Sequence, residues 1–373
     1  MTRIAIAGCG IIGAILAYEL SRTRPGNEIL VLDRQPPARG STGAALGLTI
    51  GALSLKKPKS RAWRLRRDSL KRYASLVPEL IDRTGLAIPC NPNGILKLCT
   101  TWKPTLEKWE TLSEWRRADG FRLEVLEPEL AANRFPTVNC DRAVAAIHSI
   151  DDFQVEPVAL AQAAIAAAKS RGVTFDFDAR ITGSAIEGDR VTQIRVARAS
   201  GVEAALSVEA LFVTAGAGSA AIAAHLSDTR DELKISNVLG QALHVQPRSP
   251  LDPALPVVTC NDVHIVPRCD GTLWVGATVE YPADAEPLRD PVPDPDGLDR
   301  LLAAATAFFP DCDDAATLSS WQGMRPRPVG QSAPVIQPVA GLSNALLATA
   351  HYRNGVLLAP ATAQLAINWL ASM

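Results

Sequence analysis

The stretch Arg3-Ile4-Ala5-Ile6-Ala7-Gly8-Cys9-Gly10-Ile11-Ile12-Gly13 decides the fold of this 373-residue chain. Helix-forming residues follow from Ala14 to Ser21, and a second apolar run closes on Asp33. The pattern predicts a strand, a glycine loop, a helix and a second strand, with an acid 20 residues after the last glycine. This order is typical of a dinucleotide-binding unit.

Each glycine of the loop has a physical role in such a unit. Gly8 allows a tight turn, Gly10 lets the backbone approach a pyrophosphate closely, and Gly13 lets the helix pack on the strand. The unpaired N–H groups at the start of the helix attract phosphates. The carboxylate of Asp33 can accept hydrogen bonds from a ribose.

The same stretch allows two simpler interpretations, a lipoprotein signal and a membrane-spanning helix. Its apolar run from Ile4 to Tyr18 is shorter than the roughly 18 residues that a spanning helix needs, and Glu19 follows directly. A cleaved signal would leave the strand that ends at Asp33 without its partner. We therefore expect no membrane segment.

The bulk composition is that of an ordinary globular protein. Hydrophobic residues make up 47% and charged residues 21%, which is enough for a substantial core. The net charge of −1 favours neither nucleic acid nor an anionic membrane as a partner. The seven cysteines and five histidines show no metal-ligand spacing, and the cysteines are odd in number. We therefore expect reduced thiols, a cytoplasmic location and no bound metal.

A second loop of small residues, from Gly40 to Gly47, follows the acid. Its backbone N–H groups and the hydroxyls of Ser41 and Thr42 can meet a phosphate, although a flexible linker is the alternative. Because the loop runs directly into an apolar segment that begins at Leu48, we favour a second cofactor contact.

Residues 54–73 carry nine basic side chains against one acid. Arg64, Arg67 and Lys71 have helical spacing, which favours the solvated face of a helix. A nucleic-acid patch is the alternative, but neither aromatic interleaving nor overall basicity supports it.

Two later segments have clear periodicity. A helix is expected from Thr105 to Ala118, with Trp109 and Trp115 on a stripe that faces the core. Two short apolar runs flank Cys269-Asp270-Gly271 and predict a hairpin.

A set of motifs spread along the chain identifies a resemblance to a known family. They are the N-terminal glycine motif, the loop from Gly40 to Gly47, Val155-Glu156-Pro157, Thr214-Ala215-Gly216, Ile265-Val266-Pro267-Arg268, Gly323-Met324-Arg325-Pro326 and the stretch from His351 to Thr362. Together they resemble the D-amino-acid oxidase superfamily of flavoproteins, and within it most closely the glycine oxidases. The run Arg353-Asn354-Gly355-Val356-Leu357-Leu358-Ala359-Pro360-Ala361-Thr362 is the most specific of them.

The resemblance implies an α/β (α+β) fold with a Rossmann-like FAD-binding domain and a substrate domain on a mixed, mainly antiparallel sheet. Residues 1–85, 151–222 and 325–373 would form the discontinuous FAD-binding domain, and residues 86–150 and 223–324 the substrate domain. FAD would bind non-covalently, because no cysteine follows Cys312 to form the thioether linkage of sarcosine-oxidase relatives.

The resemblance also implies the residues that hold FAD. Ile11, Ile12 and the three glycines would surround the phosphates, Asp33 and Arg34 the adenosine ribose, and Ile181 the adenine. Gly216 ends a strand that can approach the phosphates. The residues expected along the cofactor towards the flavin are Ser41, Thr42, Leu46, Gly47 and Leu48, and those around the flavin are His351, Tyr352, Asn354, Gly355, Val356 and Leu357. A helix that begins after Gly355 would stabilise the negative charge of a reduced flavin.

On the substrate side, Arg325 matches the arginine that grips the substrate carboxylate in this family. A guanidinium forks onto a carboxylate with two bonds, a geometry that lysine cannot match. Arg327 lies two residues further on and makes the choice less clean, and Arg353 is the second candidate, near the amine.

The sequence departs from the family pattern at three positions. His264 stands where the family has an active-site tyrosine, Leu239 replaces a basic residue, and Asp33 replaces a glutamate. The loss of the tyrosine weakens glycine as the assigned substrate. His264 can bind a carboxylate, titrate near neutral pH or only form a wall of the pocket.

The implied reaction is the oxidation of a small amino acid or secondary amine, such as glycine, sarcosine or a small D-amino acid. A hydride would leave Cα for flavin N5, and the imine would hydrolyse to a 2-oxo acid and ammonia. Oxygen would accept the electrons and give hydrogen peroxide, and we expect a homo-oligomer.

Three alternatives stay open. They are a dehydrogenase that passes electrons to a quinone or a partner subunit, a non-catalytic FAD-holding subunit of a larger complex, and a tRNA-modifying flavoprotein. The presence of Arg325 argues against the second, because a scaffold needs no carboxylate clamp.

Overall fold

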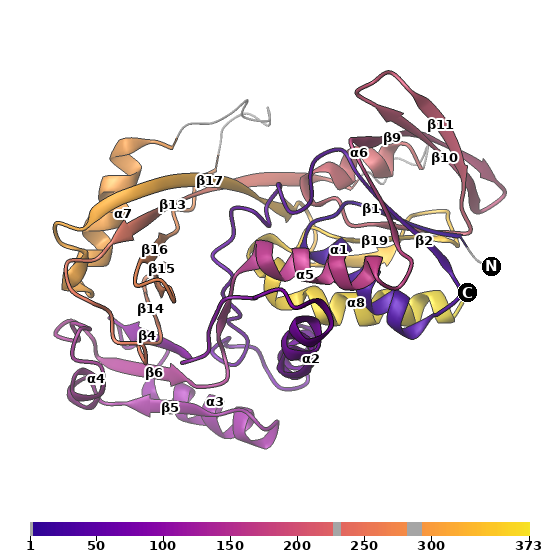
Figure 1. Cartoon of the computed structure of the whole chain (residues 1–373). Helices are drawn as coiled ribbons and strands as arrows, with labels where there is room; N and C mark the ends of the chain where they lie inside the picture. Colours follow the sequence, from indigo (N-terminus) through magenta and orange to yellow (C-terminus); the bar gives the residue numbers. More distant parts are fainter. Residues whose placement is uncertain (1–2, 227–232, 282–292) are drawn as a thin grey trace.

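The computed structural model describes residues 3–226, 233–281 and 293–373 (Figure 1). Two large β-sheets organise the chain, one at each side of the view in Figure 1. The first sheet carries the N-terminal motif, and the second is built from the middle of the sequence.

The first sheet has the strand order β18-β19-β12-β1-β2-β8. Strands β19, β12, β1, β2 and β8 run parallel, whereas β18 runs antiparallel to β19. The strands are β1 (Arg3–Ala7), β2 (Glu28–Asp33), β8 (Thr174–Phe177), β12 (Ala210–Val213), β18 (Val335–Pro338) and β19 (Ala345–Thr349). β12 and β19 are buried along their whole length, as expected for parallel strands covered on both faces.

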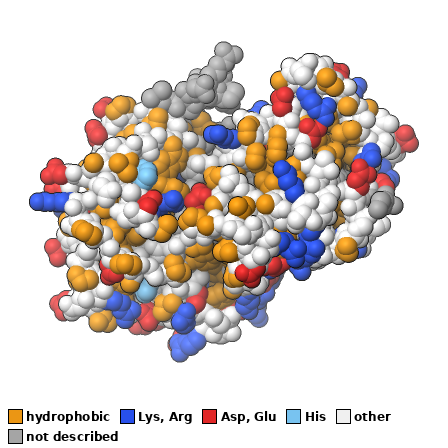
Figure 2. All heavy atoms as spheres, viewed as in Figure 1, with side chains coloured by type: hydrophobic (Ala, Val, Ile, Leu, Met, Phe, Trp, Pro, Cys, Tyr) orange, Lys and Arg blue, Asp and Glu red, His pale blue; other side chains and the backbone are white. Residues whose placement is uncertain are grey.

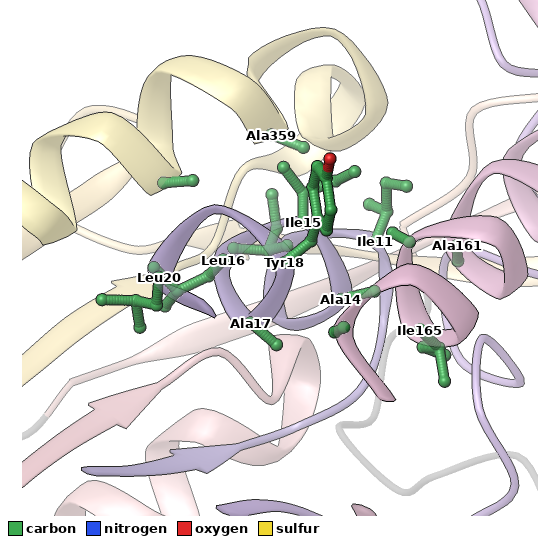
Figure 3. Close-up of a cluster of buried hydrophobic side chains, with 14 of the residues drawn as sticks. Ile11, Ala14, Ile15, Leu16, Ala17, Tyr18, Leu20, Ala161, Ile165 and Ala359 are labelled. Carbon is green, nitrogen blue, oxygen red and sulfur yellow. The ribbon is translucent and has the colours of Figure 1, made fainter. Parts of the chain in front are cut away.

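Helix α1 (Ile11–Thr23) lies at the centre of the layer on one face of this sheet. Figure 3 shows its apolar side chains between α5 (Pro157–Lys169) and α8 (Gly355–Ala371). The helix is apolar on most of its circumference, which is typical of a helix that other elements surround. α2 (Arg61–Thr84) packs on the outer side of this layer and ends at Gly85, whose φ of 68° suits a glycine.

The second sheet has the order β17-β13-β16-β15-β14-β4-β6-β5. β14 and β4 pair in parallel, and the other neighbours are antiparallel. The strands are β4 (Ile95–Cys99), β5 (Leu123–Leu126), β6 (Ala145–Ser149), β13 (Ile235–Gln246), β14 (Val257–Cys260), β15 (Val263–Pro267), β16 (Leu273–Gly276) and β17 (Ala316–Pro328). The long pair β13 and β17 reaches from this sheet towards the first one (Figure 1).

The remaining elements surround these two sheets. The helices are α3 (Leu106–Ala118), α4 (Pro128–Arg134), α6 (Ser219–Ala224) and α7 (Pro295–Thr306), with short 3-10 turns η1 (Gly216–Gly218), η2 (Pro310–Cys312) and η3 (Tyr352–Asn354). A meander of β9 (Ala179–Glu187), β10 (Arg190–Arg198) and β11 (Glu203–Ser207) forms a small sheet, and β3 (Cys90–Asn91) pairs with β7 (Gln154–Val155).

The predicted fold class is confirmed: a parallel α/β sheet stands beside a mixed, mainly antiparallel one. The division into two domains stays a prediction. Residues 227–232 and 282–292 of the predicted substrate domain lie outside the described residues, and the predicted boundary between 324 and 325 falls inside β17. The hairpin around Cys269-Asp270-Gly271 is present as β15 and β16.

One part of the α3 prediction is wrong. Trp109 is buried, but Trp115 is 39% exposed. The predicted stripe places a residue at every third position, whereas the helical repeat is 3.6 residues. The stripe therefore rotates around the helix, and Trp115 leaves the face that Trp109 buries.

Within the described ranges, no helix combines the length and the apolar character that crossing a membrane requires. On the face shown in Figure 2, acidic and basic side chains are interspersed. Of the basic residues 54–73, Arg64 and Lys71 are exposed as predicted, whereas Arg66 is buried.

Candidate active site

The glycine loop between β1 and α1 is as tight as its sequence predicts. Gly8 has a φ of +111°, and a Cβ there would lie 2.6 Å from the Cα of Ala215. A Cβ on Gly13 would lie 1.9 Å from the carbonyl oxygen of Gly8. A Cβ on Gly10 would meet the Oγ1 of Thr42 at 3.0 Å. A side chain at Gly10 would therefore clash less with the protein than one at Gly8 or Gly13.

The start of α1 is open to an anion. Its N-cap, Gly10, provides no side chain, and its first turn contains no acid among the described residues. The N–H of Ile11 donates to the Oγ1 of Thr42 over 3.0 Å, and the N–H of Ala38 donates to the carbonyl of Cys9. The second small-residue loop therefore lies directly against the first, as the sequence predicted for a shared phosphate contact.

Asp33 lies against the same loop. Its Oδ2 accepts from the N–H of Cys9 over 2.6 Å, and its Oδ1 accepts from the N–H of Gln35 over 2.9 Å. A carboxylate has further lone pairs, so these bonds leave capacity for ribose hydroxyls. Arg34 is exposed beside it.

A cavity of about 150 Å³ lies where the second loop, the second sheet and the start of α8 meet. Its lining includes these predicted site residues: Ile11, Ser41, Thr42, Leu46, Gly47, Leu48, His264, Arg325, Tyr352, Arg353, Gly355 and Val356. Segments more than 300 residues apart in the chain thus share one cavity, because Ile11 and Val356 both line it.

The wall of the cavity on β13 and β17 is made of small residues. Gly323 on β17, which faces Ala44 of the second loop, belongs to a motif already quoted from the sequence, whereas Gly240 and Ala242 on β13 and Ala277 after β16 had no predicted role. A Cβ on Gly323 would lie 2.2 Å from the Cβ of Ala44. In the sequence these glycines and alanines stand among many others, and only the pairing of Gly240 with Gly323 across the sheet distinguishes them.

Arg325 lies over this glycine wall. Its Nη1 donates to the carbonyl oxygens of Leu239 and Thr278 over 2.9 and 3.0 Å. A Cβ on Gly240 would lie 2.1 Å from its Nη2, so the guanidinium occupies the space that a side chain at 240 would fill. Among the described residues, Nη2 has no hydrogen-bond partner. Burial, followed by the charge of Arg353, lowers the pKa of Arg325.

Arg353 and Arg327 have different surroundings. Arg353 lines the cavity, and its Nη2 donates to the Oδ1 of Asp262 over 2.9 Å. Arg327 is exposed, and its guanidinium lies 5.8 and 5.9 Å from the ring centres of Tyr281 and Tyr352. The sequence left open whether Arg325 or Arg327 binds the substrate carboxylate. Arg325 lies in the cavity, whereas Arg327 lies on the surface.

His264 lies on β15 and lines the cavity. It is 8% exposed, and its Nδ1 is buried without a hydrogen-bond partner among the described residues. Burial, followed by the charge of Arg353, lowers its pKa to about 3. The ring is therefore neutral near pH 7, which argues against titration near neutrality and leaves carboxylate binding and a wall role open.

The first residues of α8 face the cavity. Gly355 and Val356 line it, and α8 has no acid in its first turn among the described residues. The Oη of Tyr73 donates to the carbonyl of Val356, and Arg66 donates to the Oδ1 of Asn354 over 3.2 Å. Arg66, which was predicted only as part of a basic helix face, thus positions this turn.

Several other predicted cofactor residues lie outside the lining of the cavity. His351 is buried, its Nε2 lies 2.9 Å from the Oγ1 of Thr362, and burial lowers its pKa to about 3. Leu357 packs in an apolar cluster with Trp63. Ile181 is buried on β9, Ile12 is buried in α1, and Gly216 has a φ of +55° in η1. Their roles stay predictions.

In the part of the chain that the structure describes, no group of three or more His, Cys, Asp or Glu side chains is placed to hold a metal ion.

Residues 3–369 match the family described as FAD dependent oxidoreductase. The chain belongs to this family. The glycine oxidase of Geobacillus kaustophilus (strain HTA426) is 28% identical over 366 residues, which are 96% of this chain and 90% of that protein. The bifunctional protein ThiO/ThiG of Trichormus variabilis is 30% identical over 386 residues, 99% of this chain and 53% of that protein. The crystal structure of glycine oxidase from Geobacillus kaustophilus matches with a TM-score of 0.84 at 26% identity, over 100% of this chain and 95% of that one.

This FAD-dependent oxidoreductase therefore has the predicted cofactor and enzyme class. Its own residues fit FAD: the glycine loop leaves the start of α1 free for a pyrophosphate, and the start of α8 faces the cavity without a competing acid among the described residues. Gly47, whose φ is +81°, keeps the second loop against β7, where a Cβ would lie 1.8 Å from the carbonyl oxygen of Val155. Non-covalent binding stays a prediction.

Proposed function

We propose that this protein oxidises a small amino acid or secondary amine, such as glycine, sarcosine or a small D-amino acid, to an imine. Hydrolysis of the imine then gives a 2-oxo acid and ammonia, or methylamine when the substrate is sarcosine. Bound FAD would accept the hydride, with its two electrons, from Cα, and with oxygen as the final acceptor hydrogen peroxide would be the other product. The glycine oxidases among the relatives support this substrate class.

The observation that carries the proposal is Arg325. It is a half-buried cation on the wall of the cavity, and two backbone carbonyls fix its Nη1. Nη2 has no partner among the described residues and is therefore available. A guanidinium fixed on one side and open on the other suits a carboxylate, because the fork geometry matches its two oxygens.

Small residues leave room beside Arg325. They are Gly240, Ala242 and Gly323. Predicted FAD-binding residues line the same cavity, so the substrate would share its space with the flavin. Orientation against the cofactor then provides most of the rate enhancement, because the reaction needs no strong base on the protein.

The charge of the cavity acts on the amine as well as on the carboxylate. The amine must be unprotonated to form the C=N bond, and the positive charge of Arg325 disfavours an ammonium group in the cavity. His264 is neutral, so it can donate a hydrogen bond to a carboxylate without adding charge.

The test is anaerobic mixing of the FAD-loaded protein with a panel of amines, followed by the absorbance of the flavin. The panel contains glycine, sarcosine, D-alanine, L-alanine and amines of the same size that lack a carboxylate. We expect bleaching by one or more of the first three. Bleaching by the carboxylate-free amines alone would contradict the proposal. Mixing the reduced protein with oxygen or with a quinone then separates an oxidase from a dehydrogenase.

We also propose that the protein is a homo-oligomer in the cytoplasm and acts on a small amino acid without a nucleic-acid partner. Light scattering of the purified protein tests the first part.

A further inference from the structure

Asp262 is an acid at the edge of the cavity to which neither the sequence nor the family match gives a role. It follows Asn261 in the two-residue turn between β14 and β15, and both residues have positive φ, 47° and 67°. Two left-handed residues in a two-residue hairpin favour Asn, Asp or Gly. The turn therefore explains why Asp is tolerated here, but it does not explain the partner of its carboxylate.

That partner comes from the other side of the cavity. The Oδ1 of Asp262 accepts from the Nη2 of Arg353 over 2.9 Å, across 91 positions of sequence. Arg353 lies in η3, directly before α8, and lines the cavity. The pair thus joins a hairpin of the second sheet to the start of the helix that the first sheet supports.

The charges around the cavity are balanced by this pair. Arg325 has an open Nη2, Arg353 is paired with Asp262, and His264 is neutral. Lys97 lies near enough to lower the pKa of Asp262, after the larger effect of Arg353. The open Nη2 of Arg325 can take one substrate carboxylate, whereas a second carboxylate would have to compete with Asp262 for Arg353.

We propose that Asp262 is a specificity-determining residue: by occupying Arg353, it selects substrates with one carboxylate over substrates with two. This inference rests on the proposed function, because it assumes that Arg325 binds the first carboxylate. Removing the charge of Asp262 frees Arg353 and removes a repulsion, so the second carboxylate of a dicarboxylic ligand gains a partner.

The pair is exposed, and this sets the size of the effect. The side chains of Arg353 and Asp262 are 35% and 68% exposed. Exposed ion pairs are weak, so a competing carboxylate faces a small barrier and the expected change in selectivity is about two- to fivefold.

The experiment measures dissociation constants of inert acids from the change that they cause in the flavin spectrum of the FAD-loaded protein. The matched pairs are acetate and malonate, propionate and succinate, and butyrate and glutarate, because the spacing of the second carboxylate is unknown. In Asp262→Asn, which suits the positive φ, at least one dicarboxylate should gain about two- to fivefold over its monocarboxylate partner. Asp262→Gly, which also suits the turn, should show the same change.

Three controls separate specificity from a structural role. In the double variant Asp262→Asn with Arg353→Gln the gain should disappear, because Arg353 is its cause. Glu124→Gln removes another exposed carboxylate paired with an arginine, Arg134 on α4, at the far edge of the second sheet and should change no ratio. If Asp262 only joins two parts of the chain, its removal lowers the melting temperature and leaves every ratio unchanged, which overturns the proposal.

The two proposals fail in different ways. Normal binding of monocarboxylates with unchanged ratios in Asp262→Asn overturns the role of Asp262 alone. If no acid in the series binds to the wild-type protein, the carboxylate site at Arg325 is wrong, and the proposed function falls together with this inference.

Discussion

The two ends of the site are built in opposite ways. The predicted phosphate end centres on one continuous stretch, from Gly8 to Gly13, which Thr42 of the second loop also contacts. The proposed substrate end joins Arg325 of β17, Gly240 of β13, His264 of β15 and Arg353 of η3. The first end can be recognised as a sequence motif, because a backbone turn depends on a few consecutive residues. The second exists only once the sheet has paired its strands.

The largest effect should come from the local end. Gly10→Val should abolish FAD retention, because a side chain there would stand between the backbone and the pyrophosphate. The protein should still fold, since among the described residues the added Cβ would meet only the Oγ1 of Thr42 within 4 Å, at 3.0 Å. The measurements are the FAD content after gel filtration and the far-UV circular dichroism spectrum. Normal FAD content would show that the opening motif has been misread. The contrast between the two ends of the site would then no longer hold.

The next effect should come from the assembled end, with FAD still bound. Arg325→Ala should lose most of the affinity for amino acids, because deletion of one partner of a desolvated charge pair costs roughly 2–5 kcal/mol, or about thirty- to several-thousand-fold. Arg325→Lys should recover only part, since a point charge lacks the fork. The measurement is anaerobic flavin reduction at varied substrate concentration.

Arg327→Ala is the matched control for Arg325, because it removes an exposed arginine two residues along the same strand. It should leave the reaction close to that of wild type. Amines without a carboxylate should respond little to either change. If Arg325→Ala reacts with glycine or sarcosine as readily as wild type does, attention moves to Arg327 and Arg353.

A single methyl group added beside Arg325 tests how exactly this residue must be placed. Gly240→Ala places a Cβ about where the guanidinium of Arg325 now lies, 2.1 Å from Nη2, so the arginine must move. Misplacement by an ångström costs about a hundredfold, and we expect a loss of about ten- to hundredfold in kcat/KM without loss of FAD. A full rate in Gly240→Ala would mean that the position of Arg325 is not critical.

Two buried histidines, His264 in the cavity and His351 beside α8, give a pH dependence of stability. Burial lowers the pKa of His351 and of His264 to about 3, below the ordinary value of 6.5. The unfolded chain therefore binds more protons, so the free energy of unfolding falls as the pH falls through 6.5 towards 3. Each histidine should contribute about 1–2 kcal/mol of loss between pH 7 and pH 5.

Urea unfolding of the wild type and of His351→Gln at pH 7 and pH 5 checks this. The variant should lose less stability between the two pH values than the wild type. Equal losses in both proteins would mean that His351 already titrates near its ordinary pKa in the folded state.

The smallest effect concerns substrate choice at His264. His264→Tyr exchanges one hydrogen-bonding group for another, and a neutral hydrogen bond is worth about 0.5–1.5 kcal/mol, or roughly two- to tenfold. We expect the ranking of glycine, sarcosine and D-alanine to change while FAD stays bound. An unchanged ranking would leave His264 as a wall of the cavity.

The sequence by itself determined the parts that depend on local backbone chemistry and on long shared motifs. The glycine loop, the acid at Asp33, the start of α8 at Gly355 and the class of fold were all predictable from residues in order. Arg325 was predictable as a candidate, because a family motif contains it. The reason is physical: turns, helix starts and tight backbone approaches depend on a few consecutive residues.

The tertiary structure decided what depends on which strands lie side by side. It separated Arg325 from Arg327, which have the same residue type but differ in burial and in their contacts. It turned Trp115 away from the core, because a three-residue spacing drifts around a helix with 3.6 residues per turn. It also brought Asp262 to Arg353, 91 residues away, and the carbonyl of Leu239 to Arg325, 86 residues away. No local pattern predicts such contacts, because they form only when the apolar surfaces of both sheets are buried during folding.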